Sequence, residues 1–263
     1  ADPLGHGFSD GDPDGIAMPL AGTFAPVPWS RGRHAQVLCV MTSAKDRLPF
    51  WYEPREVLRR VLARFTDLGL VPVMALELEF YLIDLKRGDG DTPIPGASPL
   101  TGRPETQGKV LSLAKLDEFE PVIKAMQTAC LEQGIPVTTL ISEYGAAQFE
   151  INLDHQSDAL IAADHAALLR RAILGTARDK GFDATFMSKP FPDQSGSGLH
   201  LHLSLVSDAG ENIFDPGNAQ GDAMLGHAVA GLQATMAEAM AIFAPNINVY
   251  RRFKPDEFTP VTK

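Results

Sequence analysis

The chain has 263 residues and a formal net charge of −10, with 23 Lys or Arg against 33 Asp or Glu. Hydrophobic residues make up 44% of the chain and charged residues 21%, which is typical of globular proteins and excludes the disordered and fibrous classes. The acidic balance argues against nucleic-acid binding, and no run of about 18 apolar residues suggests a membrane span. Cys39 and Cys130 cannot form a disulfide framework, so we expect a cytoplasmic protein of one or two domains.

The first half of the chain predicts two strands and one helix. Residues 1–33 are rich in Gly, Pro and Asp and predict irregular structure with short strands at most. The apolar run 36–41 predicts a buried strand, and apolar residues at helical spacing predict a helix near 54–68. Residues 71–83 predict a second strand, and the aperiodic, Gly- and Pro-rich stretch 86–109 predicts a long loop.

The second half mixes helices and strands without a regular alternation. We expect helices over about 116–133, over 157–180 with Ser157 as the N-cap, and over 222–243, and strands over 148–152 and 199–205. Because the order is irregular, the sequence predicts an α+β fold with helices packed on one side of a sheet, and not a doubly wound fold.

Two glutamates lie close together on the predicted strand 71–83. Residues two apart share one face of a strand, so Glu77 and Glu79 lie side by side, opposite a face of leucines and Phe80. Two such carboxylates repel each other unless a cation neutralises them, and Mg²⁺ prefers carboxylate oxygens. The alternative is an ordinary solvated strand face.

A second acidic segment surrounds the strand 148–152. Glu143 precedes a turn of small residues, and Gln148, Glu150 and Asn152 share one strand face. Small residues at 145–147 let the backbone approach a ligand closely. The alternative is a polar strand edge that follows a tight turn.

The third cluster combines a glycine-rich loop with a pair of histidines. Alternation places His200, His202 and Ser204 on one face of the predicted strand, where two imidazoles can point at one metal or phosphate. The preceding Gly196-Ser197-Gly198 offers backbone N–H groups suited to an anion. The alternative is a structural histidine pair beside a flexible loop.

The fourth cluster places three cations, Arg251, Arg252 and Lys254, shortly after the end of the last predicted helix. In an acidic protein such a cluster is a candidate clamp for a carboxylate or a phosphate. The alternative is an exposed basic turn.

In this order, the four clusters resemble the motifs of the glutamine synthetase family: a Glu-x-Glu strand, a Glu…Gly-x-x-Gln-x-Glu segment, Lys-Pro followed by Gly-Ser-Gly-x-His-x-His, and Asn-x-Tyr-Lys/Arg-Arg. The resemblance runs from about Asp12 to the last residue and looks closest to the γ-glutamylpolyamine synthetase (glutamate–putrescine ligase) branch. It implies a catalytic domain over 53–263 with a curved antiparallel sheet and packed helices, incomplete at its C-terminus. It also implies that residues 1–52 are the C-terminal part of a β-grasp domain.

The resemblance further implies ATP-dependent ligation of the glutamate γ-carboxylate to an amine through a γ-glutamyl phosphate. Magnesium or manganese ions would cancel the charge of the two anionic reactants. The implied roles, by position, are one metal ion held by Glu79, Glu143 and Glu150, a second held by Glu77 and His200, a nucleotide contact by His202 and Ser204, a backbone contact to glutamate from Gly196, and a carboxylate pair with Arg252. Glu150 and Arg252 are thereby expected to be catalytic.

One departure from the family bears on the acceptor. Ammonia-using members carry a glutamate six residues beyond the arginine, and Phe258 stands at that position here. An aromatic ring cannot bind ammonium through charge but can pack against an alkyl chain. We therefore expect an organic amine or polyamine acceptor, with ammonia as the alternative.

The second departure is length, because family members are longer at both ends. We expect the 263 residues to be the middle of a longer catalytic chain. Compared with the family, this segment lacks further arginines and one metal-binding glutamate. The family also implies a homo-oligomer, a ring or dodecamer with sites shared between subunits. Two alternatives from other classes are a non-catalytic relative that keeps the fold and a His-x-His metallohydrolase that binds zinc.

Overall fold

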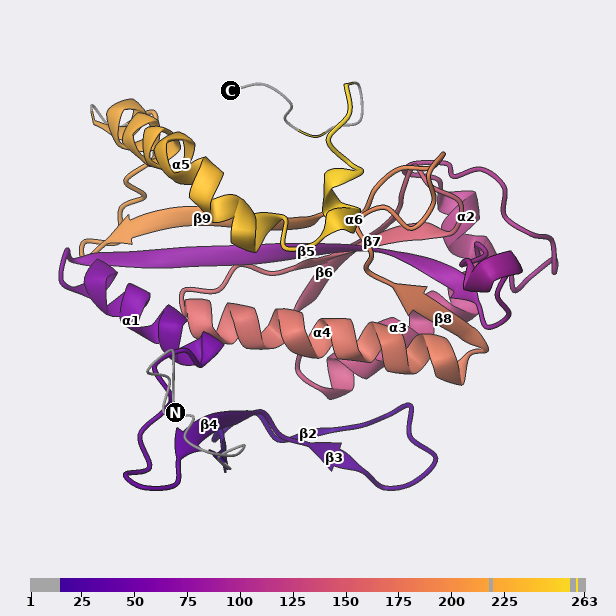
Figure 1. Ribbon diagram of the computed structural model, residues 1–263, viewed down its shortest axis with the longest axis horizontal. Helices are drawn as coiled ribbons and strands as arrows, with labels where there is room; N and C mark the ends of the chain where they lie inside the picture. The colour runs from indigo at the N-terminus through magenta and orange to yellow at the C-terminus, as the bar shows by residue number, and fades with distance from the viewer. Residues whose placement is uncertain (1–14, 218–219, 256–258, 260–263) are drawn as a thin grey trace.

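The computed structural model describes residues 15–217, 220–255 and 259. Its N-terminal part consists of two small antiparallel ribbons (Figure 1): β1 (Gly15–Pro19) pairs with β4 (Cys39–Ser43), and β2 (Ala25–Pro26) pairs with β3 (Ala35–Gln36). The prediction of one buried strand over 36–41 is wrong. The run divides between β3 and β4, and Met41 is 42% exposed, because each ribbon has only two strands and neither forms part of the main sheet.

The main sheet is antiparallel and is built around β5 (Leu70–Asp84). One edge of β5 pairs with β7 (Gln148–Leu153), which continues to β6 (Val137–Ser142), and the other edge pairs with β9 (Leu199–Ser207) and β8 (Phe182–Thr185). The predicted strands 71–83, 148–152 and 199–205 are confirmed. Strands β6 and β8 were not predicted from the sequence, because Thr138 and Thr139 interrupt the alternation of β6, and β8 has only 4 residues.

The helices are α1 (Pro54–Thr66), α2 (Leu113–Glu118), α3 (Glu120–Glu132), α4 (Ala159–Asp179), α5 (Gly221–Phe243) and α6 (Ile247–Tyr250), with a 3₁₀ turn at Asp89–Asp91. The single helix predicted over 116–133 is two helices, because Pro121 lacks an N–H and begins a new helix after Phe119. The N-cap of α4 is Asp158 and not Ser157: the Asp158 carboxylate accepts hydrogen bonds from the N–H groups of Leu160 and Ile161. In the described residues, no helix is long and apolar enough to cross a membrane.

The hydrophobic core lies between one face of the sheet and helices α3 and α4, which run below the sheet in Figure 1. Leu76, Leu78, Phe80 and Leu82 of β5 point into this core, as the alternation predicts. They pack with residues of α3 and α4 that include Met126 of α3. The expected α+β fold is confirmed, and the opposite face of β5 carries Glu77, Glu79 and Tyr81.

A glycine in α4 fixes how the N-terminal ribbons dock. A Cβ atom at Gly175 would lie 2.3 Å from the Trp29 ring, and the Arg171 guanidinium stands 5.8 Å from the centroid of the same ring. Gly175→Ala gains helix propensity but meets the indole. We expect it to lower the unfolding free energy by about 1–2 kcal/mol, measured by thermal unfolding followed through tryptophan fluorescence.

The matched control is Gly231→Ala in α5, where a Cβ atom meets nothing within 4 Å. It is expected to stabilise the chain by about 0.5–1 kcal/mol, the propensity difference alone. Equal effects of the two substitutions would contradict the docking of Trp29 on α4.

Candidate functional site

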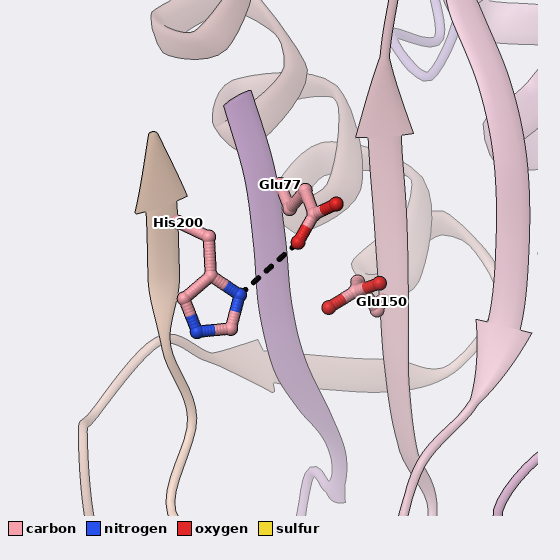
Figure 2. Close-up of side chains that lie close together, drawn as sticks. All are labelled: Glu77, Glu150 and His200. Carbon is pink, nitrogen blue, oxygen red and sulfur yellow. Dashed lines mark hydrogen bonds and ion pairs between the residues drawn. The ribbon is translucent and has the colours of Figure 1, made fainter. Parts of the chain in front are cut away.

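Strand register brings the first three sequence clusters to one face of the sheet. Across the β5–β7 pair, Glu79 lies opposite Glu150, and across the β5–β9 pair, Glu77 lies opposite His200. Directly opposed residues of antiparallel strands project to the same side. Figure 2 shows the side chains of Glu77, Glu150 and His200, one from each of three neighbouring strands, converging on the same region.

The ring of His200 lies between the two glutamates of β5. Its Nδ1 is 3.1 Å from Glu77 Oε2 and 3.8 Å from Glu79 Oε1. One ligand atom each from Glu77, Glu150 and His200 lie within 4.8 Å of one another. His202 Nε2 stands 2.8 Å from the other oxygen of Glu77, so both histidines of the pair contact the same carboxylate.

The acidic residues shift one another's ionisation. Burial, followed by the negative charges of Glu77, Glu143 and Glu79, raises the pKa of the Glu150 carboxyl from 4.5 to about 7. Burial and the charge of Glu79 also raise the pKa of Glu143. The cluster therefore carries unfavourable negative charge without a cation. Its donor set, carboxylate oxygens with one imidazole, fits a hard divalent ion such as Mg²⁺ or Mn²⁺.

A cavity of about 580 Å³ opens beside the cluster. Glu79, Glu143 and His200 line one part of it, and Arg252 and Lys254 supply positive charge. The remaining lining residues are Tyr144, Pro192, Asp193, Gln194, Ser195 and Gly196. A small anionic ligand can therefore lie between the metal-binding candidates and two cations.

Arg252 approaches this cavity through a gap that only glycine leaves. A Cβ atom at Gly196 would lie 2.7 Å from Arg252 Nε and equally close to the Ser188 carbonyl oxygen. The Arg252 guanidinium donates a 2.9 Å hydrogen bond from Nη1 to the Ser197 carbonyl oxygen. Gly196 and Arg252 are thus in contact at the cavity wall.

Most of the predicted site residues lie together. Glu77, Glu79, Glu150 and His200 form the cluster, and Glu143 borders it. His202 lines a second cavity of about 250 Å³ together with Glu77 and Asn152. Ser204 is different: it pairs with Val73, farther along β9, and lines neither of these two cavities.

No role was assigned from the sequence to Tyr81 or to Lys189 of the Lys-Pro motif, although both donate hydrogen bonds to the loop that lines the cavity. Tyr81 is fully buried, and its hydroxyl donates a 2.6 Å hydrogen bond to the Ser195 carbonyl oxygen. Burial, with the charges of Glu79 and Glu143, raises the pKa of Tyr81 well above its ordinary value, so the hydroxyl stays a donor. The alternation of β5 already places Tyr81 on the face of Glu77 and Glu79, and this was the available signal.

Comparisons with known proteins agree with this geometry. The family model of the glutamine synthetase catalytic domain matches residues 51–263. Gamma-glutamylputrescine synthetase PuuA of Escherichia coli is 36% identical over 97% of this chain and 54% of its own length. Glutamate–isopropylamine ligase of a Pseudomonas species is 33% identical over 94% and 53%. The solved structure of apo GmaS superimposes with a TM-score of 0.79 at 28% identity, over 95% of this chain and 56% of that one. The chain thus spans about half the length of the curated relatives it matches.

Proposed function

Because the chain belongs to the glutamine synthetase family, we propose that it catalyses ATP-dependent ligation of the glutamate γ-carboxylate to an amine. In the first step, a γ-carboxylate oxygen attacks the γ-phosphorus of ATP and ADP leaves. In the second, the amine nitrogen attacks the acyl carbon, phosphate leaves, and the nitrogen loses a proton. The observation that carries the proposal is the acidic cluster beside a cavity lined by Arg252 and Gly196.

The cluster would hold divalent metal ions. We assign Glu79, Glu143 and Glu150 to one ion and Glu77 with His200 to the other. When bound, the ions would reduce the repulsion between the carboxylate and the phosphate groups. The raised pKa values of Glu143 and Glu150 support this assignment, because they reflect first the burial of these carboxylates and then the negative charge of the neighbouring glutamates.

The remaining roles concern substrate orientation. Arg252 would pair with a carboxylate of glutamate, and the Gly196 backbone would contact the same ligand. We assign His202 and Ser204 to the nucleotide side, although His202 contacts Glu77 in this structure. The second cavity, which His202 lines, supports the assignment for His202 alone.

We propose an organic amine, and a polyamine in particular, as the acceptor in place of ammonia. The names of two relatives, gamma-glutamylputrescine synthetase and glutamate–isopropylamine ligase, support this choice. Phe258, on which the expectation from the sequence rests, lies outside the described residues. Of the charged residues that line the cavity, Arg252 and Lys254 would repel a protonated amine, whereas Glu143 and Asp193 would attract it, so we place the acceptor on the side of Glu143 and Asp193.

The acceptor is tested by an amine panel on the purified protein, expressed as the complete chain that its gene encodes. Glutamate, ATP and Mg²⁺ are supplied with putrescine, ethylamine, isopropylamine or ammonia, and ADP release is measured. We expect the highest kcat/KM with an organic amine. A preference for ammonia would identify a glutamine synthetase in the narrow sense, and no turnover with any amine would favour the non-catalytic relative.

Three further features stay proposals. We place the domain boundary near residue 52, which the start of the family match at residue 51 supports. We also propose a homo-oligomer. The exposed leucines of β9 support it, since Leu199 is 65% and Leu201 53% exposed, and solvent exposure of such a row is unfavourable. The cytoplasmic location remains a prediction.

A further inference from the structure

The loop before β9 has an unusual hydrogen-bonding pattern. Each carbonyl oxygen from residue 194 to residue 198 accepts a hydrogen bond from a different donor elsewhere in the chain. In order along the loop, these donors are Lys189 Nζ at 2.6 Å, Tyr81 Oη at 2.6 Å, Gln148 Nε2 at 2.9 Å, Arg252 Nη1 at 2.9 Å and the Glu79 N–H at 3.1 Å. The loop therefore turns its carbonyl side toward the protein.

Three of the donors are buried side chains that have no assigned role in the reaction. Tyr81 is 0%, Gln148 2% and Lys189 3% exposed. Gln148 Nε2 also donates to Glu79 Oε2 at 3.3 Å and to Ser197 Oγ at 3.3 Å. The side-chain oxygen Oε1 of Gln148 accepts a hydrogen bond from the Gly145 N–H. Gln148 thus joins a metal-binding candidate, the turn after Glu143 and the loop.

The amide side of the loop is left open. Within the part of the chain that the structure describes, the N–H groups of Ser195 and Gly196 have no hydrogen-bond partner, and both residues line the 580 Å³ cavity. The next two amides are satisfied: Ser197 donates to the Ser188 carbonyl and Gly198 donates to Glu79 Oε2 at 3.0 Å. Consecutive free N–H groups form an anion-binding concavity.

We propose that Tyr81, Gln148 and Lys189 are positioning residues that hold the carbonyl groups of 194–196 inward, so that the Ser195 and Gly196 amides bind a substrate carboxylate. The proposal rests on glutamate being the substrate. Their contribution is preorganisation: donors that are already fixed do not have to be ordered when the ligand binds. None of the three side chains needs to touch the substrate.

Tyr81→Phe is the sharpest test, because it removes one hydroxyl and leaves the ring that packs edge-on against Phe191, with centroids 5.1 Å apart. The Ser195 carbonyl then loses its donor. We expect KM for glutamate to rise about tenfold with KM for ATP unchanged, and the loop amides 194–198 to exchange hydrogen faster. Gln148→Met, which keeps the side-chain length, is expected to act in the same direction and more strongly.

The control is Tyr250→Phe, which removes the hydroxyl of a tyrosine that is 52% exposed on α6. It should change neither KM nor exchange. An unchanged glutamate KM in both Tyr81→Phe and Gln148→Met would overturn the proposal, whether or not hydrogen exchange becomes faster. The hydrogen bonds from Tyr81 and Gln148 to the loop would then have only a structural role. If the wild-type protein turns over no glutamate, the proposed function fails. In that case, unchanged hydrogen exchange of the loop amides 194–198 in Tyr81→Phe separately refutes the positioning role of Tyr81.

Discussion

Glu150→Gln is expected to lower ligase activity by at least about 10³-fold and to abolish stabilisation of the chain by Mg²⁺. The Glu150 side chain belongs to a residue that is 7% exposed. One of its carboxylate oxygens lies within 4.8 Å of a ligand atom of Glu77 and of a ligand atom of His200. An amide is a poorer ligand for a hard cation, and loss of metal catalysis costs several kcal/mol. Steady-state kinetics and thermal unfolding with and without Mg²⁺ measure the two effects.

The same substitution is expected to stabilise the metal-free protein, in a pH-dependent way. The folded chain raises the pKa of Glu150 from 4.5 to about 7, so folding becomes less favourable as pH rises through this interval. The penalty is absent below about pH 4.5 and complete above about pH 7. Unfolding in EDTA should therefore show Glu150→Gln to be about 1–3 kcal/mol more stable than wild type at pH 8, with a smaller difference at pH 5.5.

Glu132→Gln is the charge-matched control. Glu132 is the last residue of α3 and is exposed. Its replacement by Gln changes the net charge by the same amount as Glu150→Gln, but away from the cluster. It should alter neither the Mg²⁺ response nor the activity. An undiminished Mg²⁺ response in Glu150→Gln would contradict the assignment of the cluster to metal binding. A metal-free variant that is less stable than wild type at pH 8 would contradict the raised pKa of Glu150.

Arg252→Met is expected to raise KM for glutamate by about 10²-fold and to leave KM for ATP nearly unchanged. The guanidinium lies at the cavity wall against Gly196 and holds the Ser197 carbonyl, so its removal deletes both a charge and a contact that orders the loop. Truncating one partner of a charge-assisted pair costs roughly 2–5 kcal/mol. Methionine keeps the length of the aliphatic stem, so the loss reports the guanidinium.

Arg251→Met is the neighbouring control. Arg251 is exposed and, unlike Arg252 and Lys254, is not among the residues that line the 580 Å³ cavity. Its replacement should leave both KM values within about twofold of wild type. Equal effects of the two arginine substitutions would indicate a general role of positive charge and not a specific clamp at residue 252.

Strand alternation predicted the central part of the site. A period of two places Glu77 and Glu79 on one face of β5 and Glu150 and His200 on one face of β7 and β9, and the structure brings these faces together. The same pattern could not predict which strands are neighbours, because pairing depends on long-range register. The order β6-β7-β5-β8, with β9 also on β5, appears only in the structure.

Two helix starts differ from the sequence prediction for local reasons. Asp158 displaced Ser157 as the N-cap because both residues are suitable caps and the helix begins one residue later. Pro121 is not compatible with the interior of a single helix over 116–133, so α2 ends before it and Pro121 lies in the first turn of α3. The role of Tyr81 was hidden for a different reason, since its partner, the Ser195 carbonyl, is a backbone group 114 residues away.

The central claim is tested most directly by the stoichiometry of the reaction. The complete gene product is incubated with glutamate, ATP, Mg²⁺ and putrescine, and ADP, phosphate and the γ-glutamyl amide are quantified together. The proposed function predicts one ADP and one phosphate for each amide formed, with no amide when glutamate, amine or Mg²⁺ is omitted. ATP hydrolysis without amide formation for any amine, or Mg²⁺-independent turnover, would contradict it.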